Sequence, residues 1–313
     1  MGFQVPKDTY TGKVNTLKLG KDKSETLLGG ESTLPFYSFE GEIVNRPIIA
    51  MDVYDSRPLS WPDYLFNYFS DVADDSIKWA RKCIEEFKAD AICFHLTKVN
   101  PDIGNMTPEE AGKLVKSIRE AIDKSLIVYA DAPLDIVAEV MKKVCEINAE
   151  SNILLGWTED DNYKTLAASA IGYKNNLIAL NPLDVNLAKQ LNILLTQLGL
   201  PAERIAMDPS SSGLGYGIEY CFSAMERLKI AALFQDDKMT QMPMINNIAA
   251  EIWKVKEVKE SEEIYPEWGS LEERGINWEA ISVMCMLLCG SNIVTMRHPK
   301  AVKLVKELIS ELL

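Results

Sequence analysis

The sequence lacks any Cys-x-x-Cys pair. Its six cysteines are scattered along 313 residues, and the nearest two, Cys285 and Cys289, lie one helical turn apart in an apolar segment. Iron–sulfur clusters and structural zinc sites usually show at least one closely spaced pair of thiolates. We therefore expect buried thiols that pack as small hydrophobic side chains, with no iron–sulfur cluster and no metal site in this chain.

Long apolar runs and an excess of positive charge are also missing. No apolar stretch approaches the roughly 18 residues of a membrane-spanning helix, and the N-terminus has no apolar leader segment, so the expected compartment is the cytoplasm. Lys and Arg total 33 against 46 for Asp and Glu, which gives a formal charge of −13. Such a surface repels nucleic acid and anionic membranes. A small ligand, or a protein with a basic patch, is the expected partner.

Familiar catalytic motifs are absent as well. The chain contains no Gly-x-Gly-x-x-Gly, no Walker loop, no Gly-x-Ser-x-Gly elbow and no His-Glu-x-x-His. Catalysis by a nucleophile or a metal therefore has no support in the sequence, and we predict no catalytic residue.

Eight short apolar runs are present, nearly all separated by helix-like stretches. Each ends in a polar or turn-forming residue: Ile48–Asp52, Ala91–His95, Leu126–Asp131, Ile153–Trp157, Leu177–Asn181, Ile205–Asp208, Met244–Asn246 and Asn292–Arg297. Continuous apolar runs indicate strands buried on both faces, as in a parallel sheet. Eight such strands predict an α/β fold, a (β/α)₈ TIM barrel over residues 47–313. The strand-end residues would then share one rim, where such barrels bind ligands.

Helical periodicity fills the gaps between these runs. The predicted helices span about residues 75–88, 107–124, 133–148, 162–173, 185–198, 217–233, 278–288 and 299–313. Thr107, Asp161 and Asp184 precede three of them and are predicted to cap the first turn.

Residues 1–46 are polar, rich in glycine and without helical periodicity, so they form an N-terminal extension. Alternation over residues 14–19 indicates a strand. The extension is either a hairpin that closes the bottom of the barrel or an arm that clasps a partner subunit. Two connections, 54–74 and 254–275, are unusually long and contain several aromatic residues. We expect both to be ordered loops at the rim that contact a partner or a cofactor.

Carboxylate and amide side chains gather among the predicted strand ends. Asp52, Asp131, Asn181 and Asn246 can together recognise a heterocycle that carries amide and amine edges, because they offer matched donors and acceptors. Alternatively, these residues only cap the helices that follow the strands. We predict ligand contact for about half of them.

The segment Met207–Gly217 follows the sixth run and precedes a helix. Its glycines allow a close approach of the backbone to a ligand, and its hydroxyls and amides can donate hydrogen bonds. Asp208, Ser210, Ser211 and Gly213 are therefore candidate binding residues. The alternative is a loop that merely needs positive φ angles.

His95 and His298 are the only histidines, and both follow apolar runs. We expect His95 to be buried with its hydrogen bonds satisfied. His298 is predicted to face a ligand, because the adjacent Arg297 offers a planar fork for a carboxylate or phosphate.

Several phrases of the sequence resemble a known family. They are Gly29-Gly30-Glu31, Leu34-Pro35-Phe36-Tyr37, Asn45-Arg46-Pro47, Met207-Asp208-Pro209 and the run from Asn292 to Pro299. Together they resemble the small subunit of corrinoid iron–sulfur proteins, also described as the delta subunit of the carbon monoxide dehydrogenase/acetyl-CoA synthase complex. The likeness runs from about residue 10 to the C-terminus.

This resemblance implies a TIM barrel that pairs with a large subunit carrying a [4Fe–4S] cluster and a cobalamin-binding domain. Cobalamin would rest between that domain and the rim of this barrel. The heterodimer would take a methyl group from methyltetrahydrofolate through a methyltransferase and deliver it to acetyl-CoA synthase. His95 is followed by Leu96-Thr97-Lys98, so the Asp-x-His-x-x-Gly pattern that supplies a histidine to cobalt is absent.

A second function remains open at this level. Asp208-Pro209 before a Gly-rich turn also resembles pterin-binding barrels, which favours a pterin-dependent methyltransferase. The turn from Ser210 to Tyr216 departs from the usual pterin loop, and no basic residue follows it. The carrier subunit is the preferred interpretation. Its predicted cofactor-binding residues are Asp52, Asp131, Asn181, Asp208, Ser210, Ser211, Gly213, Asn246, Arg297 and His298.

Overall fold

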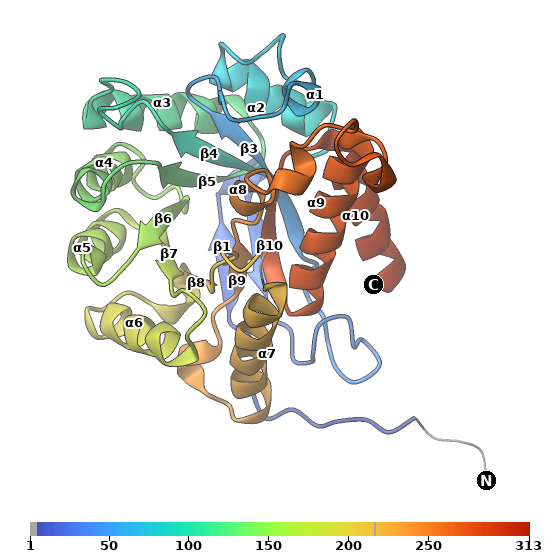
Figure 1. The fold of residues 1–313 in the computed structure, drawn as a ribbon. Helices are drawn as coiled ribbons and strands as arrows, with labels where there is room; N and C mark the ends of the chain where they lie inside the picture. The colour runs from blue at the N-terminus through green and yellow to red at the C-terminus, as the bar shows by residue number, and fades with distance from the viewer. Residues whose placement is uncertain (1–4, 216) are drawn as a thin grey trace.

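Eight parallel strands close into a barrel in the computed structural model, which describes residues 5–215 and 217–313 (Figure 1). The barrel order is β10-β3-β4-β5-β6-β7-β8-β9. The strands are β3 (Ile48–Tyr54), β4 (Ala91–Leu96), β5 (Ser125–Ala130), β6 (Leu154–Thr158), β7 (Asn176–Leu180), β8 (Ile205–Asp208), β9 (Met244–Asn246) and β10 (Ser291–Met296). The predicted TIM barrel is confirmed, and all eight apolar runs form its strands.

Helices surround this barrel on the outside (Figure 1). The long ones are α2 (Ser76–Glu85), α3 (Pro108–Ala121), α4 (Leu134–Ile147), α5 (Tyr163–Tyr173), α6 (Val185–Gln197), α7 (Ile218–Phe234), α9 (Leu271–Leu288) and α10 (Pro299–Leu312). The short helices are α1 (Asp63–Phe66) and α8 (Ala249–Ile252). None of the helices in the described part of the chain is long and apolar enough to cross a membrane.

One predicted helix boundary was wrong. The helix expected from Trp278 begins at Leu271 instead, because Ser270 caps it by accepting a hydrogen bond from the Glu273 backbone N–H. Of the predicted caps, Thr107 and Asp184 are confirmed by bonds to the first turns of α3 and α6. Asp161 does not cap α5, whose N-cap residue is Asn162.

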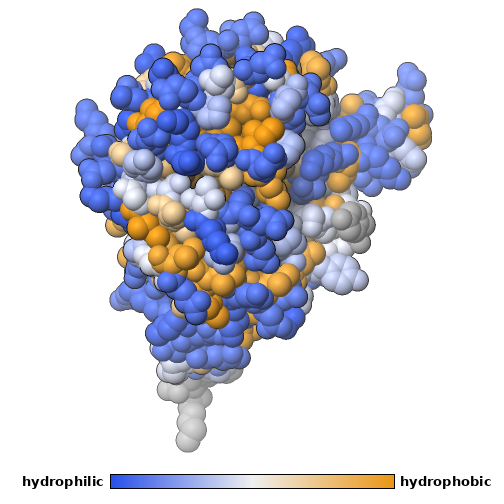
Figure 2. Space-filling view, turned by 90° about the vertical axis from the view of Figure 1, so that its left-hand side faces the viewer, coloured by the Kyte–Doolittle hydropathy of each residue, from blue (hydrophilic) through white to orange (hydrophobic). Residues whose placement is uncertain are grey.

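The strands bury both faces because alternate residues point inward and outward. Outward residues such as Met51 and Phe94 pack against the helices, whereas Ala50, Ile127 and Ile178 fill the interior of the barrel. The helices present mainly polar side chains to solvent, interrupted by apolar patches on the side of α3 to α6 (Figure 2).

The N-terminal extension forms a two-stranded hairpin beneath the barrel. Strands β1 (Thr16–Leu19) and β2 (Thr26–Gly29) pair antiparallel, and their buried leucines Leu17, Leu19 and Leu28 join the interior cluster of the barrel. The Ser125 hydroxyl, at the start of β5, donates to the Ser24 carbonyl. Of the two alternatives for the extension, residues 16–29 therefore adopt the hairpin that closes the bottom.

A buried ion pair fixes the end of this hairpin to the barrel. Lys229 of α7 lies with its Nζ 2.7 Å from Glu31 Oε1, and Asn292 of β10 donates to the same carboxylate. The Lys229 and Glu31 side chains are only 3% and 9% exposed. Burial by itself would raise the pKa of Glu31, but the charge and hydrogen bond of Lys229 lower it below its usual value.

The two long loops that follow β3 and β9 pack against each other. The Tyr64 hydroxyl donates to the Val258 carbonyl over 2.7 Å, and Tyr68 reaches Glu272. Trp61 and Phe69 are buried against Trp79 of α2. Their aromatic residues pack within the chain, and contact of the loops with a partner or a cofactor stays a prediction.

Candidate functional site

The carboxyl ends of the strands surround an open cavity of about 640 Å³. Residues from the ends of β3 to β6 and from the loops after β9 and β10 line it. They include Tyr54, Trp61, His95, Asp131, Trp157, Asn247, Trp253 and Arg297. We call this space the mouth cavity. Apolar rings with a few convergent polar groups are typical of binding sites for small molecules and cofactors.

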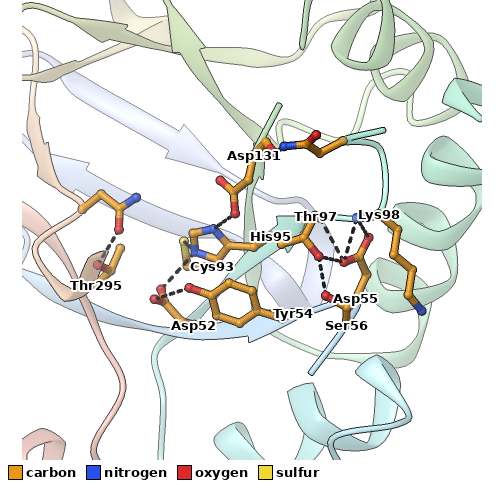
Figure 3. A network of polar contacts seen from close by, with 12 residues as sticks. Asp52, Tyr54, Asp55, Ser56, Cys93, His95, Thr97, Lys98, Asp131 and Thr295 are labelled. Atoms are coloured by element: carbon orange, nitrogen blue, oxygen red, sulfur yellow. Dashed lines mark hydrogen bonds and ion pairs between the residues drawn. The ribbon is translucent and has the colours of Figure 1, made fainter. Parts of the chain in front are cut away.

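His95 is the centre of a polar network on one side of the mouth cavity (Figure 3). Its Nδ1 lies 3.1 Å from Asp131 Oδ2, and its Nε2 lies 3.3 Å from Asp52 Oδ1 and 3.5 Å from Cys93 Sγ. The Tyr54 ring stacks on the imidazole with centroids 4.5 Å apart. His95 is therefore buried and fully engaged, as expected, and it links the mouth to the barrel interior.

Arg297, which directly follows β10, completes this network. Its Nε donates to Asp52 Oδ2 and its Nη2 donates to the Tyr54 hydroxyl, both over 2.7 Å. The guanidinium also lies 5.0 Å from the centroid of the Trp61 ring. The Arg297 guanidinium, predicted to bind an external anion, therefore donates to Asp52 and Tyr54 of the same chain.

The network balances its own charge. Burial alone would raise the pKa of Asp52, but His95 and Arg297 lower it below its usual value. Burial alone would lower the pKa of His95, but Tyr54, Cys93 and the two carboxylates raise it well above its usual value. Two carboxylates thus face two cations, which is the condition for keeping charges in a dry site.

A second polar group lies on the opposite side of the barrel mouth, at the ends of β7 to β9. Trp157 connects the two groups, since it lines the mouth cavity and donates from Nε1 to Asp208 Oδ2 over 3.0 Å. Asn246 donates to the Ser211 hydroxyl over 3.3 Å. Within residues 5–215 and 217–313, the buried Oδ1 atoms of Asn181 and Asn246 have no hydrogen-bond partner. Acceptors left unpaired in this way are available to a donor from outside the chain.

The sequence-predicted residues therefore fall into three sets. Asp52, Asp131 and Arg297 form the network around His95, and five others form the second group: Asn181, Asp208, Ser210, Ser211 and Asn246. Asp131 contacts His95 and does not cap α4, whose N-cap residue is Pro133.

Gly213 and His298 lie apart from the mouth cavity. A Cβ at Gly213 would meet the Gly217 carbonyl oxygen at 2.6 Å, so this glycine serves the close approach of the loop to α7. His298 is fully buried, stacks on Trp253 and caps α10 by accepting a hydrogen bond from the Lys300 backbone N–H. The prediction that His298 faces a ligand was therefore wrong. Its side chain is buried, and its Nδ1 accepts a hydrogen bond at the N-terminus of α10.

Sequence reasoning missed Tyr54 and Cys93 as members of the site. Both lie two residues from a predicted strand-end residue, Tyr54 from Asp52 and Cys93 from His95. Residues two apart on a strand share a face, so this spacing was the available signal. This signal was hard to see because β3 and β4 are buried on both faces, so polar and apolar residues do not alternate along them.

Asp208 is expected to make the stability of the fold depend on pH. Burial raises the pKa of its carboxyl to about 6 from 3.8, despite hydrogen bonds from Trp157 and the Ser210 backbone. A folded pKa above the unfolded one means that stability is present at low pH and is lost as the pH rises through about 6. The loss should total about 3 kcal/mol. Urea unfolding from about pH 4 to pH 7 should show this slope in the wild type and not in Asp208→Asn. Equal slopes in the two proteins would contradict it.

The family model and the curated relatives point to the same family. The model of the family described as CO dehydrogenase/acetyl-CoA synthase delta subunit matches residues 16–300. The acetyl-CoA decarbonylase/synthase complex subunit delta of Methanocaldococcus jannaschii is 31% identical over 98% of this chain and 76% of its own length. The protein of the same description from Archaeoglobus fulgidus is 32% identical over 99% of this chain and 71% of its own length.

Solved structures show where else this fold occurs. The 7,8-dihydropteroate synthase from Vibrio fischeri aligns with a TM-score of 0.56 at 11% identity, covering 95% of this chain and 98% of that one. The dihydropteroate synthase from Xanthomonas albilineans with 4-aminobenzoic acid aligns with a TM-score of 0.55 at 12% identity, over 87% and 94%. At this identity the likeness concerns the barrel alone. On the family match and the near-complete alignment with its relatives, this chain belongs to the CO dehydrogenase/acetyl-CoA synthase delta subunit family.

Proposed function

We propose that this chain is the small subunit of a heterodimeric corrinoid iron–sulfur methyl carrier, and that its mouth cavity covers cobalamin held by a large subunit. The observation that carries the proposal is an open cavity with aromatic and polar walls at the ligand-binding end of a barrel of this family. When bound, cobalamin would supply the cobalt that carries a methyl group. The carrier would receive this group from methyltetrahydrofolate through a methyltransferase and deliver it to acetyl-CoA synthase.

The residues present fit this role. A cavity of about 640 Å³ that is open to solvent is too small to enclose a whole cobalamin, but it can cover one face of the macrocycle. Trp157 offers an apolar ring, and the Asp131 carboxylate and the Asn247 amide, which line the cavity, offer polar groups to the amide side chains of a corrin. The chain's own residues would thus orient the cofactor and exclude water from it.

The iron–sulfur cluster is assigned to the large subunit. Cys285 and Cys289 lie in and just after α9, and the Cys289 thiol donates to the Cys285 carbonyl. All six cysteines are free thiols, and five of them are buried. Among the described residues, the group of potential metal ligands that comes together contains a single cysteine, Cys93, whereas a [4Fe–4S] cluster is usually held by four.

A tryptophan placed in the mouth cavity tests the proposal. Ala132 lines the cavity and is partly exposed at the edge of the core, so Ala132→Trp places a large ring at the cavity wall. Unchanged circular dichroism would show that the fold tolerates it. Gly172 of α5 is the matched control, because a side chain there meets nothing within 4 Å. With the large subunit co-expressed, Ala132→Trp should lower corrinoid retention at least about 10-fold, measured by visible absorption, and Gly172→Trp should not. Full retention in Ala132→Trp would contradict the proposed site.

The second candidate, a pterin-dependent methyltransferase, is favoured by the unpaired acceptors near Asp208 and by the shared barrel of the dihydropteroate synthases. The purified chain distinguishes the two. A carrier subunit should neither bind methyltetrahydrofolate nor transfer methyl to free cobalamin, whereas the enzyme would do both. Hydrogen exchange of the loops 54–69 and 254–275 adds a second measurement, since added protection on complex formation is expected of a carrier.

A further inference from the structure

We propose that Asp52, Cys93 and His95 form a binding site for a divalent transition-metal ion of the zinc type. The three residues come from adjacent strands: Asp52 of β3 is the register partner of Cys93 of β4, and His95 lies two residues further along β4. All three side chains are buried beneath the mouth cavity. The spacing Cys-x-His with a distant Asp gave no signal in the sequence, where no metal was expected.

The distances between the ligand atoms fit a tetrahedral site. Zinc bonds of about 2.0–2.2 Å to nitrogen and oxygen and about 2.3 Å to sulfur place neighbouring ligand atoms roughly 3.3–3.6 Å apart. His95 Nε2 lies 3.3 Å from Asp52 Oδ1 and 3.5 Å from Cys93 Sγ. All three atoms lie within 4.8 Å of one another. The distances from His95 Nε2 to Asp52 Oδ1 and to Cys93 Sγ therefore match those of a tetrahedral zinc site.

One poorly satisfied atom also points to a ligand. Asp52 Oδ1 is buried, and its partner among the described residues is His95 Nε2, at 3.3 Å and without hydrogen-bond geometry. A buried carboxylate oxygen that lacks a good hydrogen bond is energetically costly. A cation between Oδ1, Nε2 and Sγ would satisfy this atom.

Neighbouring side chains orient two of the three proposed ligands, His95 and Asp52, by hydrogen bonds and ion pairs. The other imidazole nitrogen, Nδ1, lies 3.1 Å from Asp131 Oδ2, which is the carboxylate–histidine arrangement common behind metal-binding histidines. The other oxygen of Asp52, Oδ2, accepts from Arg297 Nε over 2.7 Å, so Arg297 orients the carboxylate and Oδ1 faces His95 Nε2.

The ligand set also selects the kind of ion. A thiolate with an imidazole suits zinc and similar transition metals, whereas magnesium and calcium prefer oxygen ligands. Burial raises the pKa of Cys93, so the metal would displace the Cys93 thiol proton and the His95 Nε2 proton as it binds. Three protein ligands leave a fourth coordination position for water or a bound molecule, as in zinc sites that are not purely structural. Of the three ligands, His95 lines the mouth cavity, whereas Asp52 and Cys93 lie fully buried.

Cobalt(II) is the probe that tests this site in the purified full chain. One equivalent should give a thiolate-to-cobalt charge-transfer band, and Zn²⁺ should abolish it by displacing the cobalt. Cys93→Ser should lose the band, whereas Cys145→Ser, which changes an equally buried thiol on α4, should keep it. No band in the wild type, or a band that survives in Cys93→Ser, would overturn the proposal.

Asp131→Asn provides a variant that should keep its fold, because this side chain is 33% exposed. It removes the carboxylate behind His95 and should weaken zinc binding about 10–100-fold in competition with a chromophoric chelator. Far-ultraviolet circular dichroism should be unchanged. Unchanged zinc affinity in Asp131→Asn would contradict the assigned geometry, even if the corrinoid proposal were correct.

Discussion

Replacing Lys229 with methionine is expected to lower the free energy of unfolding by about 3–5 kcal/mol. The substitution leaves the Glu31 carboxylate buried with only Asn292 as a partner. An unpaired charge in a dry site is costly, whereas exposed ion pairs contribute about 1 kcal/mol or less. Urea unfolding followed by circular dichroism measures the loss, and Lys238→Met, which breaks the exposed pair with Asp236, is the surface control.

The double variant Lys229→Met/Glu31→Gln separates charge from packing. Because it removes both charges, it should recover most of the lost stability. The pH dependence gives a further check. The folded pKa of Glu31 is lowered, so the contribution of the pair is present above the unfolded value of 4.5 and is lost as the pH falls through the folded one. A single variant that loses less than about 1 kcal/mol near neutral pH would refute this account.

Arg297→Met is expected to be equally damaging, with a loss of about 3–5 kcal/mol. Among the described residues, Asp52 Oδ2 accepts hydrogen bonds from Arg297 Nε at 2.7 Å and from the Tyr54 hydroxyl at 3.4 Å. Methionine keeps the apolar contact with the Trp61 ring but leaves Asp52 with His95 as its remaining cation. Thermal and urea unfolding measure the effect.

Arg297→Lys is the informative control for this prediction. Lysine keeps the charge, but a single ammonium cannot reproduce the planar pair of bonds to Asp52 and the Tyr54 hydroxyl. We expect an intermediate loss of about 1–3 kcal/mol. A lysine variant as stable as the wild type would show that charge alone, and not the fork, holds the network together.

The barrel was predictable because its signal is repeated eight times. Runs such as Ala91–His95 are apolar on both faces, and only strands buried between helices and a barrel interior require that. The start of α9 was missed because its first turns are polar, Leu271-Glu-Glu-Arg, and resemble a solvated loop. The Ser270 cap was the available sign.

The site was only partly predictable. Strand-end position correctly brought Asp52, Asp131 and Arg297 together, because parallel strands end at a common rim. It could not reveal that Arg297 turns inward toward Asp52 and is engaged within the chain, nor that His298 serves a helix N-terminus. Those outcomes depend on the stagger of strands and on side-chain rotamers, which spacing in a sequence does not encode. Whether the predicted residues touch a corrinoid stays a prediction.

The β1–β2 hairpin and the residues around it contact barrel strands that are synthesised much later. Glu31 is bonded to Asn292, which follows it by 261 positions, and Asn176 of β7 holds the Lys18 carbonyl. Strands β1 and β2 are synthesised before the barrel strands, so the hairpin cannot complete these contacts until β10 has emerged. Contacts of such long sequence separation slow folding, because the chain entropy is lost before they form. A nascent chain stopped before residue 292 should still leave its N-terminal hairpin open to proteases.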